Sequence, residues 1–450
     1  MSKWLVVGHS NGGQGAWYTL THHPDKVFAA APLSGYSSIQ NYVPYTFWRP
    51  ADPGRTSVLQ SALLPYNHEL LLSNAKAIPV FQQHGSADDN VPPYHSRLMS
   101  QLIVEAGGES QYVEYLGKPH WWDGIFTTDP LKDFIEDNLS RMNGNSTKDR
   151  SDMDDFSLVT ANPGDTGPKN GIEILQLATP GQLGRLDVSY NRSTHVRTIQ
   201  VSNVMALSLT SFADDDSVIV NDEEIVQRGQ GITLPLTLTE ENGIWQVAAS
   251  PNFEISRTRR RGRQLGAMDA ILRTQGAFSI VQRTNSSAAS HIALQISRNL
   301  CQYFAADTEI TLDYASALEN STGNIISVAI GSDLPRNLHE TFPIQISEHG
   351  NQVLIRIGKH QRRYYALRDS GLAAIYLRPI PGDQRLELVV WGIDEASLAI
   401  AARMVPMMTG SGQPDFIVAD ATMLWKGIEG IRAMGFLDWQ WEVSRNAFFA

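Results

Sequence analysis

The chain has 450 residues, of which 42% are hydrophobic and 18% are charged. This composition is ordinary for a folded protein, and the length suffices for two or three domains. The formal net charge of -11 would repel phosphate backbones and anionic membrane surfaces, so we expect no nucleic acid partner. No run of 18 apolar residues occurs and the start, MSKWLVVGHS, lacks the features of a signal peptide, so no membrane partner is expected either.

The first 141 residues alternate short apolar runs with amphipathic stretches, a pattern typical of a doubly wound α/β sheet. Pro24 ends the first helical stretch, and Gly107 with Gly108 ends the second. These elements make up about half of such a domain. We expect strands at Trp4–Val7, Val27–Leu33, Val80–His84 and Tyr112–Leu116, and helices at Gly13–Thr21, Tyr94–Ala106 and Leu131–Arg141.

The composition changes after residue 142. Residues 143–171 are rich in Asn, Asp, Gly and Ser and predict a linker. Residues 172–256 contain short apolar stretches between polar turns, which predict a small antiparallel sandwich or barrel. The basic run Arg257–Arg263 is interpreted as a solvated loop. Residues 264–450 alternate helical and strand patterns, which predicts a second α/β domain of unknown role.

The strongest functional signal is the segment WLVVGHSNGGQG, in which an apolar strand runs into G-x-S-x-G and then into a helix. This context predicts a nucleophile elbow, a sharp turn that holds a serine in a strained conformation at the end of the sheet. We expect Gly8 and Gly12 to let the strand and the helix approach each other without a Cβ clash. Ser10 is the predicted nucleophile, and the backbone N–H of Asn11 is the predicted oxyanion donor.

A serine hydroxyl needs a base that takes its proton, and a carboxylate that holds this base in the correct tautomer. In the α/β-hydrolase arrangement the order along the chain is Ser, acid, His. Asp88 follows the third predicted strand, and His120 lies on the loop before the last helix. The sequence therefore predicts a catalytic triad of Ser10, Asp88 and His120.

Several neighbours compete for these roles. Asp89 is an alternative acid beside Asp88. His84 and His95 are alternative bases, although we expect His84 to shape its turn and His95 to lie on a helix face. His9 is expected to pack under the elbow.

The loop after the predicted base carries two aromatic residues and an acid. We expect Trp121 and Trp122 to pack against the protein, with stacking on a substrate as the alternative. Asp123 could instead cap or orient the loop. These roles are left open by the sequence.

The blocks GHSNGG, HGSADDNVPP and KPHWWDG resemble the signature blocks of the prolyl oligopeptidase family of serine peptidases, including secreted fungal hydrolases. The resemblance covers residues 3–141 and implies an α/β-hydrolase fold, of which this segment is the C-terminal half of the sheet. In that family the first aspartate of the HG-x-x-DD-x-V block is the triad acid, which maps onto Asp88. The rest of the chain resembles the C-terminal extension of large fungal proteins of this type, for which no role is implied.

The nucleophile strand of an α/β hydrolase lies in the middle of its sheet, yet here it begins at residue 3. The resemblance implies earlier strands, a second oxyanion donor and a β-propeller, and the sequence shows no counterpart of them. We therefore expect a fragment of a longer enzyme, with a short form that pairs with a partner chain as the alternative. By itself the chain should have weak or no activity, because one lost oxyanion donor costs about 10²- to 10³-fold in kcat. Exposed apolar residues on the first strand should favour aggregation.

Three functions stay open at this stage. The chain could be a serine peptidase that acts on peptides through an acyl-enzyme, a carboxylesterase with the same triad, or a non-catalytic binding module formed by residues 172–450. A peptide or ester substrate is the expected partner, and the oligomeric state is not predicted. No phosphate-binding motif and no His/Cys cluster occurs, so we expect no cofactor and no metal, and we interpret the runs Asp152–Asp155 and Asp214–Asp216 as solvated loops.

Two smaller features complete the sequence. The single cysteine, Cys301, lies in an apolar helical stretch and is expected to be a buried, inert thiol. N-x-S/T sequons would suit a glycosylated protein that is secreted in its full-length form. They begin at Asn138, Asn145, Asn191, Asn285 and Asn320.

Overall fold

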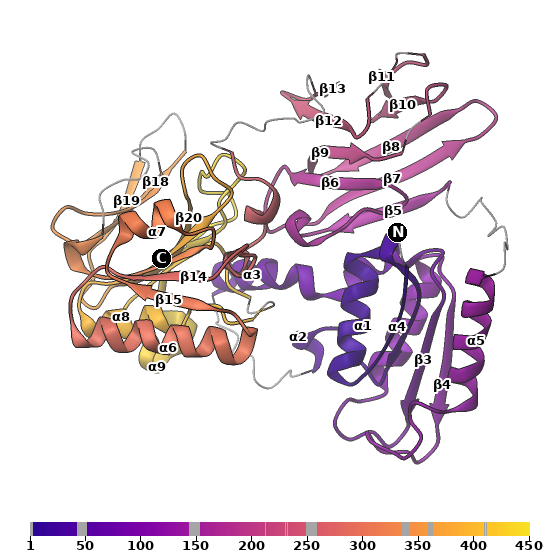
Figure 1. Cartoon of the computed structure of the whole chain (residues 1–450), viewed down its shortest axis with the longest axis horizontal. Helices are drawn as coiled ribbons and strands as arrows, with labels where there is room; N and C mark the ends of the chain where they lie inside the picture. Colours follow the sequence, from indigo (N-terminus) through magenta and orange to yellow (C-terminus); the bar gives the residue numbers. More distant parts are fainter. Residues whose placement is uncertain are drawn as a thin grey trace. The chain divides into compact units, whose positions relative to one another are not determined.

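The computed structural model (Figure 1) divides the chain into two compact units. The first unit contains residues 1–48, 65–177 and 183–253, and the second contains residues 49–64, 178–182 and 254–450. No helix among the described residues is long and apolar enough to cross a membrane. The structure describes residues 3–42, 52–143, 154–211, 213–229, 231, 233–248, 259–334, 342–358, 363–408, 410 and 412–450.

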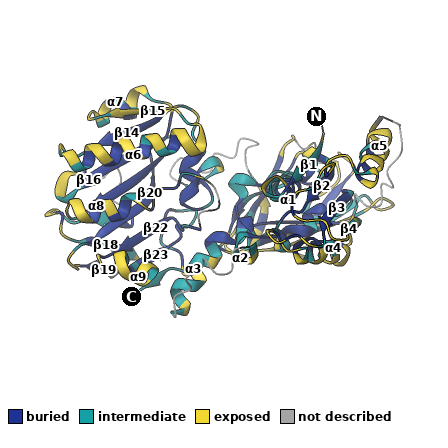
Figure 2. Cartoon of the chain, turned by 90° about the horizontal axis from the view of Figure 1, so that it is seen from below, coloured by how far each residue is buried: buried dark blue, intermediate teal, exposed yellow. Residues whose placement is uncertain are grey.

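The first unit begins with a parallel four-stranded sheet in the order β1-β2-β3-β4. Alternate residues of a strand face opposite sides, so Ala30 packs with α1 and α4 while Ala29 packs with α5. Figure 2 shows the two central strands, β2 and β3, buried among helices whose outer faces are exposed. The elements are β1 (Trp4–His9), α1 (Asn11–His22), β2 (Val27–Leu33), α2 (Ile39–Tyr42), the 3-10 helix η3 (His68–Ala75), β3 (Val80–Gly85), α4 (Tyr94–Glu105), β4 (Ser110–Tyr115) and α5 (Asp129–Asn143).

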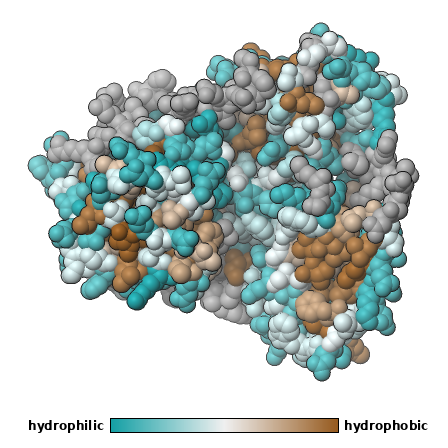
Figure 3. All heavy atoms as spheres, in the orientation of Figure 1, coloured by the Kyte–Doolittle hydropathy of each residue, from teal (hydrophilic) through white to brown (hydrophobic). Residues whose placement is uncertain are grey.

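Strand β1 lies at the edge of this sheet, because within the described part of the chain it pairs with β2 alone. Trp4 is 46% exposed, whereas Leu5 and Val6 are half-buried. Figure 3 shows a hydrophobic patch on the surface where the strands of this sheet lie in Figure 1. An edge with free backbone groups and apolar side chains can pair with another chain.

The β-rich part of the first unit is a sandwich of two sheets around one core. The sheets have the orders β11-β10-β8-β7-β5 and β13-β12-β9-β6. The sandwich is not wholly antiparallel as expected, because β10 pairs with β8 in parallel. Its strands are β5 (Phe156–Thr160), β6 (Ile172–Leu177), β7 (Gly184–Asn191), β8 (Val196–Ser202), β9 (Val204–Leu209), β10 (Ser217–Val220), β11 (Glu223–Val226), β12 (Leu236–Glu241) and β13 (Ile244–Val247).

The segment expected to be a linker, residues 143–171, contains strand β5. Phe156 and Leu158 of this strand are buried in the core of the sandwich, and β5 pairs with β7. Its apolar run is short and lies among polar residues, so its pairing partner, distant in sequence, decides its structure. The stretch therefore includes an edge strand of the sandwich.

Within the first unit, side chains of η3 and of the turn before β2 form hydrogen bonds with the β-sandwich. The buried amide of Asn74, on η3, donates to the carbonyls of Thr21 and Val159 and accepts from Val159 N–H at 2.7 Å. Asp25 accepts from the backbone N–H of Asn170 at 2.7 Å. The backbone groups of Thr21, Val159 and Asn170 thereby gain hydrogen-bond partners at this contact, as polar groups require on burial.

The second unit contains a mixed eight-stranded sheet in the order β15-β14-β16-β21-β20-β22-β23-β24, together with a three-stranded meander of β17, β18 and β19. Strands β15, β14, β16 and β21 are parallel, and the remaining pairs are antiparallel. Its elements are α3 (Pro53–Leu63), β14 (Phe278–Gln282), α6 (Ser287–Phe304), β15 (Thr308–Thr311), α7 (Tyr314–Asn320), β16 (Ile325–Ile330), β17 (Ile344–Ile346), β18 (Val353–Ile357), β19 (Arg363–Leu367), β20 (Ala373–Pro379), β21 (Leu386–Gly392), α8 (Glu395–Ala402), β22 (Phe416–Ala419), α9 (Met423–Lys426), β23 (Ile431–Gly435) and β24 (Phe448–Phe449).

Helix α3 belongs to the second unit, although residues 1–142 were expected to form one domain. Arg55 on this helix donates through Nε and Nη2 to the carbonyl oxygen of Ile431, at 3.1 and 2.9 Å. Its guanidinium also lies 4.4 Å from the ring centre of Phe448. The residues that hold α3 are more than 370 positions away in the chain, so local sequence patterns carry no sign of them.

Two expectations about single residues are wrong. Arg260, in the basic run expected to be solvated, is 2% exposed and forms a bidentate ion pair with Asp415 at 2.7 Å. The charges of Arg260 and Asp415 compensate each other in the core. A sequence pattern cannot reveal this pairing, because the two residues lie far apart in the chain. Cys301 is exposed, because α6 buries the stripe that contains Ile296 and Leu300, and the next residue along the helix faces solvent.

One expected glycosylation site is also excluded. The side chain of Asn138 is 6% exposed, and its amide donates to the carbonyl oxygen of Phe134 on the same helix. A glycan needs an accessible amide. Asn145 lies outside the described residues, and Asn191, Asn285 and Asn320 are exposed.

Buried histidines should make the first unit sensitive to mild acid. Burial lowers the pKa of His22 to about 4 and that of His68 to about 3. Between pH 6.5 and about 4 the unfolded chain therefore binds protons that the folded chain does not, and the free energy of unfolding should fall by up to about 1.4 kcal/mol per pH unit for each histidine. Urea unfolding of the full chain at pH 7, 6 and 5 measures this slope.

The matched variants assign the slope to a residue. His68→Gln should weaken the pH dependence, whereas His291→Asn should leave it unchanged because His291 is exposed on α6. A stability that is constant from pH 7 to 5 in the parent chain would contradict the prediction.

Candidate active site

Ser10 lies on the turn between β1 and α1 with φ 59° and ψ -118°. This is a strained conformation for a residue with a side chain, and such strain costs about 1–3 kcal/mol. The Ser10 N–H donates to the carbonyl oxygen of Leu33 at 3.0 Å, and the Ser10 carbonyl accepts from Gln14 N–H at 3.0 Å. Both neighbouring elements therefore hold the turn that presents the hydroxyl.

The glycines of the elbow differ in what they do. A Cβ on Gly8 would lie 2.0 Å from the carbonyl oxygen of Gly12, and a Cβ on Gly13 would lie 2.7 Å from that of Leu33. A Cβ on Gly12 would meet nothing within 4 Å. The expectation that Gly8 and Gly12 both allow the close approach is therefore correct for Gly8 alone, and Gly13 has the second role.

The structure brings Ser10, Asp88 and His120 together. The Nε2 atom of His120 lies 2.9 Å from Ser10 Oγ, and its Nδ1 atom lies 2.7 Å from Asp88 Oδ2. Both distances are those of hydrogen bonds. The imidazole thus connects the hydroxyl to the carboxylate in the geometry that a base and its orienting acid require.

The side chain of Asp88 is fully buried, and its carboxylate makes four polar contacts. Oδ1 accepts from the N–H groups of Asn90 at 3.0 Å and Val91 at 2.8 Å, while Oδ2 lies near His120 and 3.2 Å from Nε2 of His84. Burial raises its pKa, but the hydrogen bonds from the two histidines and from Val91 outweigh burial and lower the pKa to about 2. The carboxylate is therefore ionised at neutral pH.

Two further histidines support the triad. His84, at the end of β3, has Nδ1 2.8 Å from Ser96 Oγ and Nε2 2.8 Å from the Val91 carbonyl oxygen. It therefore shapes the turn that carries Asp88, as expected. His9 has Nε2 3.0 Å from the His120 carbonyl oxygen, which makes Nε2 the protonated nitrogen.

His9 contributes to the site as a neutral side chain. Burial and the nearby His120 lower its pKa to about 4. Its ring centre lies 4.1 Å from that of Trp121, which is 63% exposed. His9 was expected only to pack under the elbow, and its link to the His120 loop is a tertiary contact that no motif reveals.

The other residues that the sequence offered for roles at the site have different surroundings. Asp89 is exposed, next to the buried Asp88. His95 has Nδ1 3.3 Å from Ser37 Oγ. Trp122 packs near Tyr115, and Asp123 is exposed.

Asn11, the predicted oxyanion donor, is the first residue of α1. The N–H groups in the first turn of a helix have no partner within the helix, and the helix dipole favours negative charge there. The side-chain oxygen of Asn11 accepts a hydrogen bond from Tyr36 Oη at 3.3 Å. Tyr36 stacks on Tyr42 at 4.5 Å, and Tyr42 Oη donates to Asn90 at 3.0 Å, so these side chains connect the elbow to the Asp88 turn.

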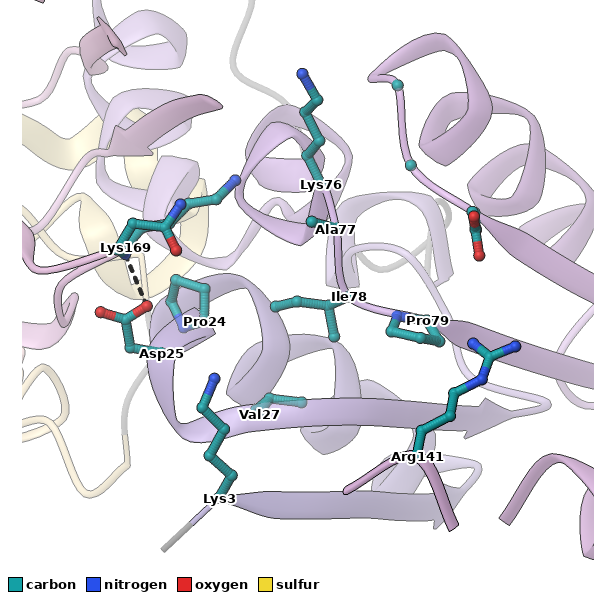
Figure 4. A pocket seen from close by; sticks show the side chains of 14 residues that line it. Lys3, Pro24, Asp25, Val27, Lys76, Ala77, Ile78, Pro79, Arg141 and Lys169 are labelled. Atoms are coloured by element: carbon teal, nitrogen blue, oxygen red, sulfur yellow. Dashed lines mark hydrogen bonds between the residues drawn. The ribbon is translucent and has the colours of Figure 1, made fainter. Parts of the chain in front are cut away.

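A separate cavity of about 330 Å³ lies at the amino-terminal edge of the same sheet, whereas Ser10 follows the carboxyl end of β1. Figure 4 shows that the charged ends of Lys3, Lys76 and Arg141 lie well apart from one another around it. The Nζ atom of Lys169 donates to the carbonyl oxygens of Ser73 and Ser157. These cations do not converge on one point, so we assign no catalytic role to this cavity.

One group of side chains could hold a metal ion. His195, Asp215 and Asp216 place their ligand atoms within 4.8 Å of one another. Asp216 already accepts a hydrogen bond from Tyr190 Oη at 2.7 Å, and Asp215 is exposed. Exposed acidic groups of this kind are common without an ion, so we assign no role to the group.

Residues 1–134 match the family model of the prolyl oligopeptidase family. This match confirms the resemblance that the three sequence blocks predict. An uncharacterized secreted protein of Arthroderma benhamiae is 36% identical over 456 residues, which cover 99% of this chain and 47% of that protein. The chain therefore spans about half the length of this relative.

Solved structures of hydrolases align with 30–31% of the chain. A dipeptidyl aminopeptidase IV of Bacteroides ovatus is 13% identical, with 18% of its chain covered and a TM-score of 0.23. Est1E of Butyrivibrio proteoclasticus is 20% identical, with 63% of its chain covered and a TM-score of 0.26. Because these TM-scores are low, the catalytic triad is assigned from the distances between its own side chains.

The two glycines of the motif should respond differently to substitution. Gly8→Ala should cost more than about 4 kcal/mol of unfolding free energy, because the new Cβ would meet a backbone oxygen. Gly12→Ala should change it by less than about 1 kcal/mol, because the space is open. Urea unfolding of both variants checks this, and equal losses would show that the elbow geometry is wrong.

Proposed function

We propose that the chain carries a serine hydrolase site and that it acts as a serine-type peptidase. The observation that carries this proposal is the continuous hydrogen-bonded connection from Ser10 Oγ through His120 to Asp88, at 2.9 and 2.7 Å. A hydroxyl in this setting can lose its proton as it attacks a carbonyl carbon. The strained turn exposes it at the carboxyl edge of the sheet.

The mechanism follows from these contacts. Ser10 Oγ forms a bond to the substrate carbonyl carbon while His120 Nε2 takes its proton, and the carbonyl oxygen becomes an oxyanion near Asn11 N–H. The bond between the carbon and the leaving amine then breaks, and the amine receives the proton that His120 Nε2 took from Ser10. Water repeats the two steps on the acyl-enzyme and releases the carboxylic acid and free Ser10. Asp88 stays ionised and stabilises the imidazolium.

Peptide bond cleavage is proposed over ester cleavage because residues 1–134 match a peptidase family. The triad itself serves both reactions, since both leave an acyl-serine. We further propose that this chain alone turns substrates over slowly, because Asn11 N–H is the one oxyanion donor that we assign. Secretion is proposed from the Arthroderma benhamiae relative, which is described as a secreted protein.

Labelling with a fluorophosphonate tests the nucleophile. The probe should modify Ser10 in the full chain, and Ser10→Ala should not be labelled. Asp88→Asn should slow labelling by about 10³- to 10⁴-fold because the imidazole loses its orienting carboxylate. Asp89→Asn is the matched control and should label at the parent rate, because this side chain is exposed. Labelling that survives Ser10→Ala would end the case for this nucleophile.

A substrate comparison tests the class of reaction. Alanine- and proline-linked p-nitroanilides and p-nitrophenyl esters should both be hydrolysed slowly, and Ser10→Ala should abolish both activities. Amide hydrolysis that depends on Ser10 supports a peptidase. Ester hydrolysis without any amide hydrolysis would instead identify a carboxylesterase.

A further inference from the structure

A cavity in the second unit lies between strand β20 and the β17–β18 hairpin, and its volume is about 190 Å³. Tyr376 and Arg378 of β20 line one side, and residues 344–348 line the other. The hairpin packs closely against the turn after β16, because a Cβ on Gly350 would lie 2.1 Å from the carbonyl carbon of Gly331. The walls of the cavity are thereby held in place by backbone contacts.

Two buried side chains present unused hydrogen-bond donors to this cavity. Tyr376 is 2% exposed and Arg378 is 7% exposed, and they lie two residues apart on one face of β20. Arg378 uses Nε and Nη2 to bind Glu387, both at 2.8 Å. Within the described part of the chain, no hydrogen bond reaches Arg378 Nη1 or Tyr376 Oη, and neither atom is among the polar atoms sealed from solvent. Both donors therefore open into the cavity.

The Arg378–Glu387 ion pair leaves a donor available to a ligand, because the carboxylate of the pair is already satisfied. Glu387 is fully buried and accepts from Arg378 and from Tyr314 Oη. Glu387 balances the charge of Arg378, and both of its oxygens already accept hydrogen bonds, from Arg378, Tyr314 and Ser327. The group of this ion pair that stays available to a ligand is therefore Arg378 Nη1. Glu348 is the acidic side chain among the described lining residues, and it is exposed at the rim.

The tyrosine hydroxyl is able to donate. Burial raises the pKa of Tyr376 to about 12, so the hydroxyl keeps its proton at neutral pH. A buried donor without a partner is unfavourable, and a ligand that accepts from it removes this cost. Hydrogen bonds from a guanidinium to a carboxylate are among the strong ones.

We propose that this cavity binds a small organic carboxylate, whose oxygens accept hydrogen bonds from Tyr376 Oη and Arg378 Nη1. The volume exceeds the roughly 150 Å³ of a cavity that holds benzene, so a ligand about the size of benzoate fits. The proposal does not depend on the hydrolase site, because all lining residues belong to the second unit.

Calorimetric titration of the full chain with sodium benzoate tests the proposal, with benzamide as the uncharged analogue and inorganic phosphate as a different anion. Benzoate should bind in a saturable manner, and benzamide and phosphate should bind at least tenfold more weakly. Tyr376→Phe should weaken benzoate binding at least tenfold while leaving the melting temperature unchanged, because the lost hydroxyl bonds to no described residue.

Three control variants make the result specific. Tyr314→Phe removes the other tyrosine hydroxyl of the cluster, which does not line the cavity, and should change affinity by less than about threefold although it lowers stability. Ser10→Ala should bind benzoate like the parent chain, which excludes binding at the hydrolase site. Ser332→Phe places a ring at the cavity wall and should abolish binding. Benzoate affinity unchanged in Tyr376→Phe, equal affinity for benzamide, tighter binding of phosphate, or no saturation up to about 10 mM would each overturn the proposal.

Discussion

The hydrogen bond between His120 Nδ1 and Asp88 Oδ2 is the interaction on which the site depends. It joins the loop after β4 to the turn after β3, and it directs the other ring nitrogen of His120 at Ser10. His84 supports the Asp88 turn from one side and His9 holds the His120 loop from the other. Removing the carboxylate would leave the ring free to adopt the wrong tautomer, so catalysis depends on a residue that never touches the substrate.

The strained elbow is possible because two backbones approach each other more closely than side chains allow. The sheet supplies the strand that ends at Ser10, and α1 begins immediately after it. Gly8 and Gly13 have no Cβ at the points of contact. The cost of the strained serine is offset by the packing of α1 on the sheet, where Trp17 and Leu20 are buried.

Buried charges are found in both units, but they have different consequences. In the first unit, Asp88 is satisfied completely by protein groups, so its charge serves to orient a histidine. In the second unit, Arg260 and Asp415 pair completely and tie the start of that region to its sheet. Arg378 keeps one nitrogen unused beside a cavity. A buried charge that is paired within the protein holds parts of the fold together, whereas a buried donor without a partner can bind a ligand.

Motifs with local context could be interpreted from the sequence alone. Strand, G-x-S-x-G and helix follow one another directly, so Ser10 was predictable, and the fixed order of the other blocks pointed to Asp88 and His120. Helix α6 was predictable because its apolar residues repeat at helical spacing over 18 residues. Contacts between distant residues were decided by the tertiary structure alone. The position of α3 in the second unit, the pairing of β5 and the burial of Arg260 each depend on partners far along the chain, and no short pattern encodes which distant surface covers a residue.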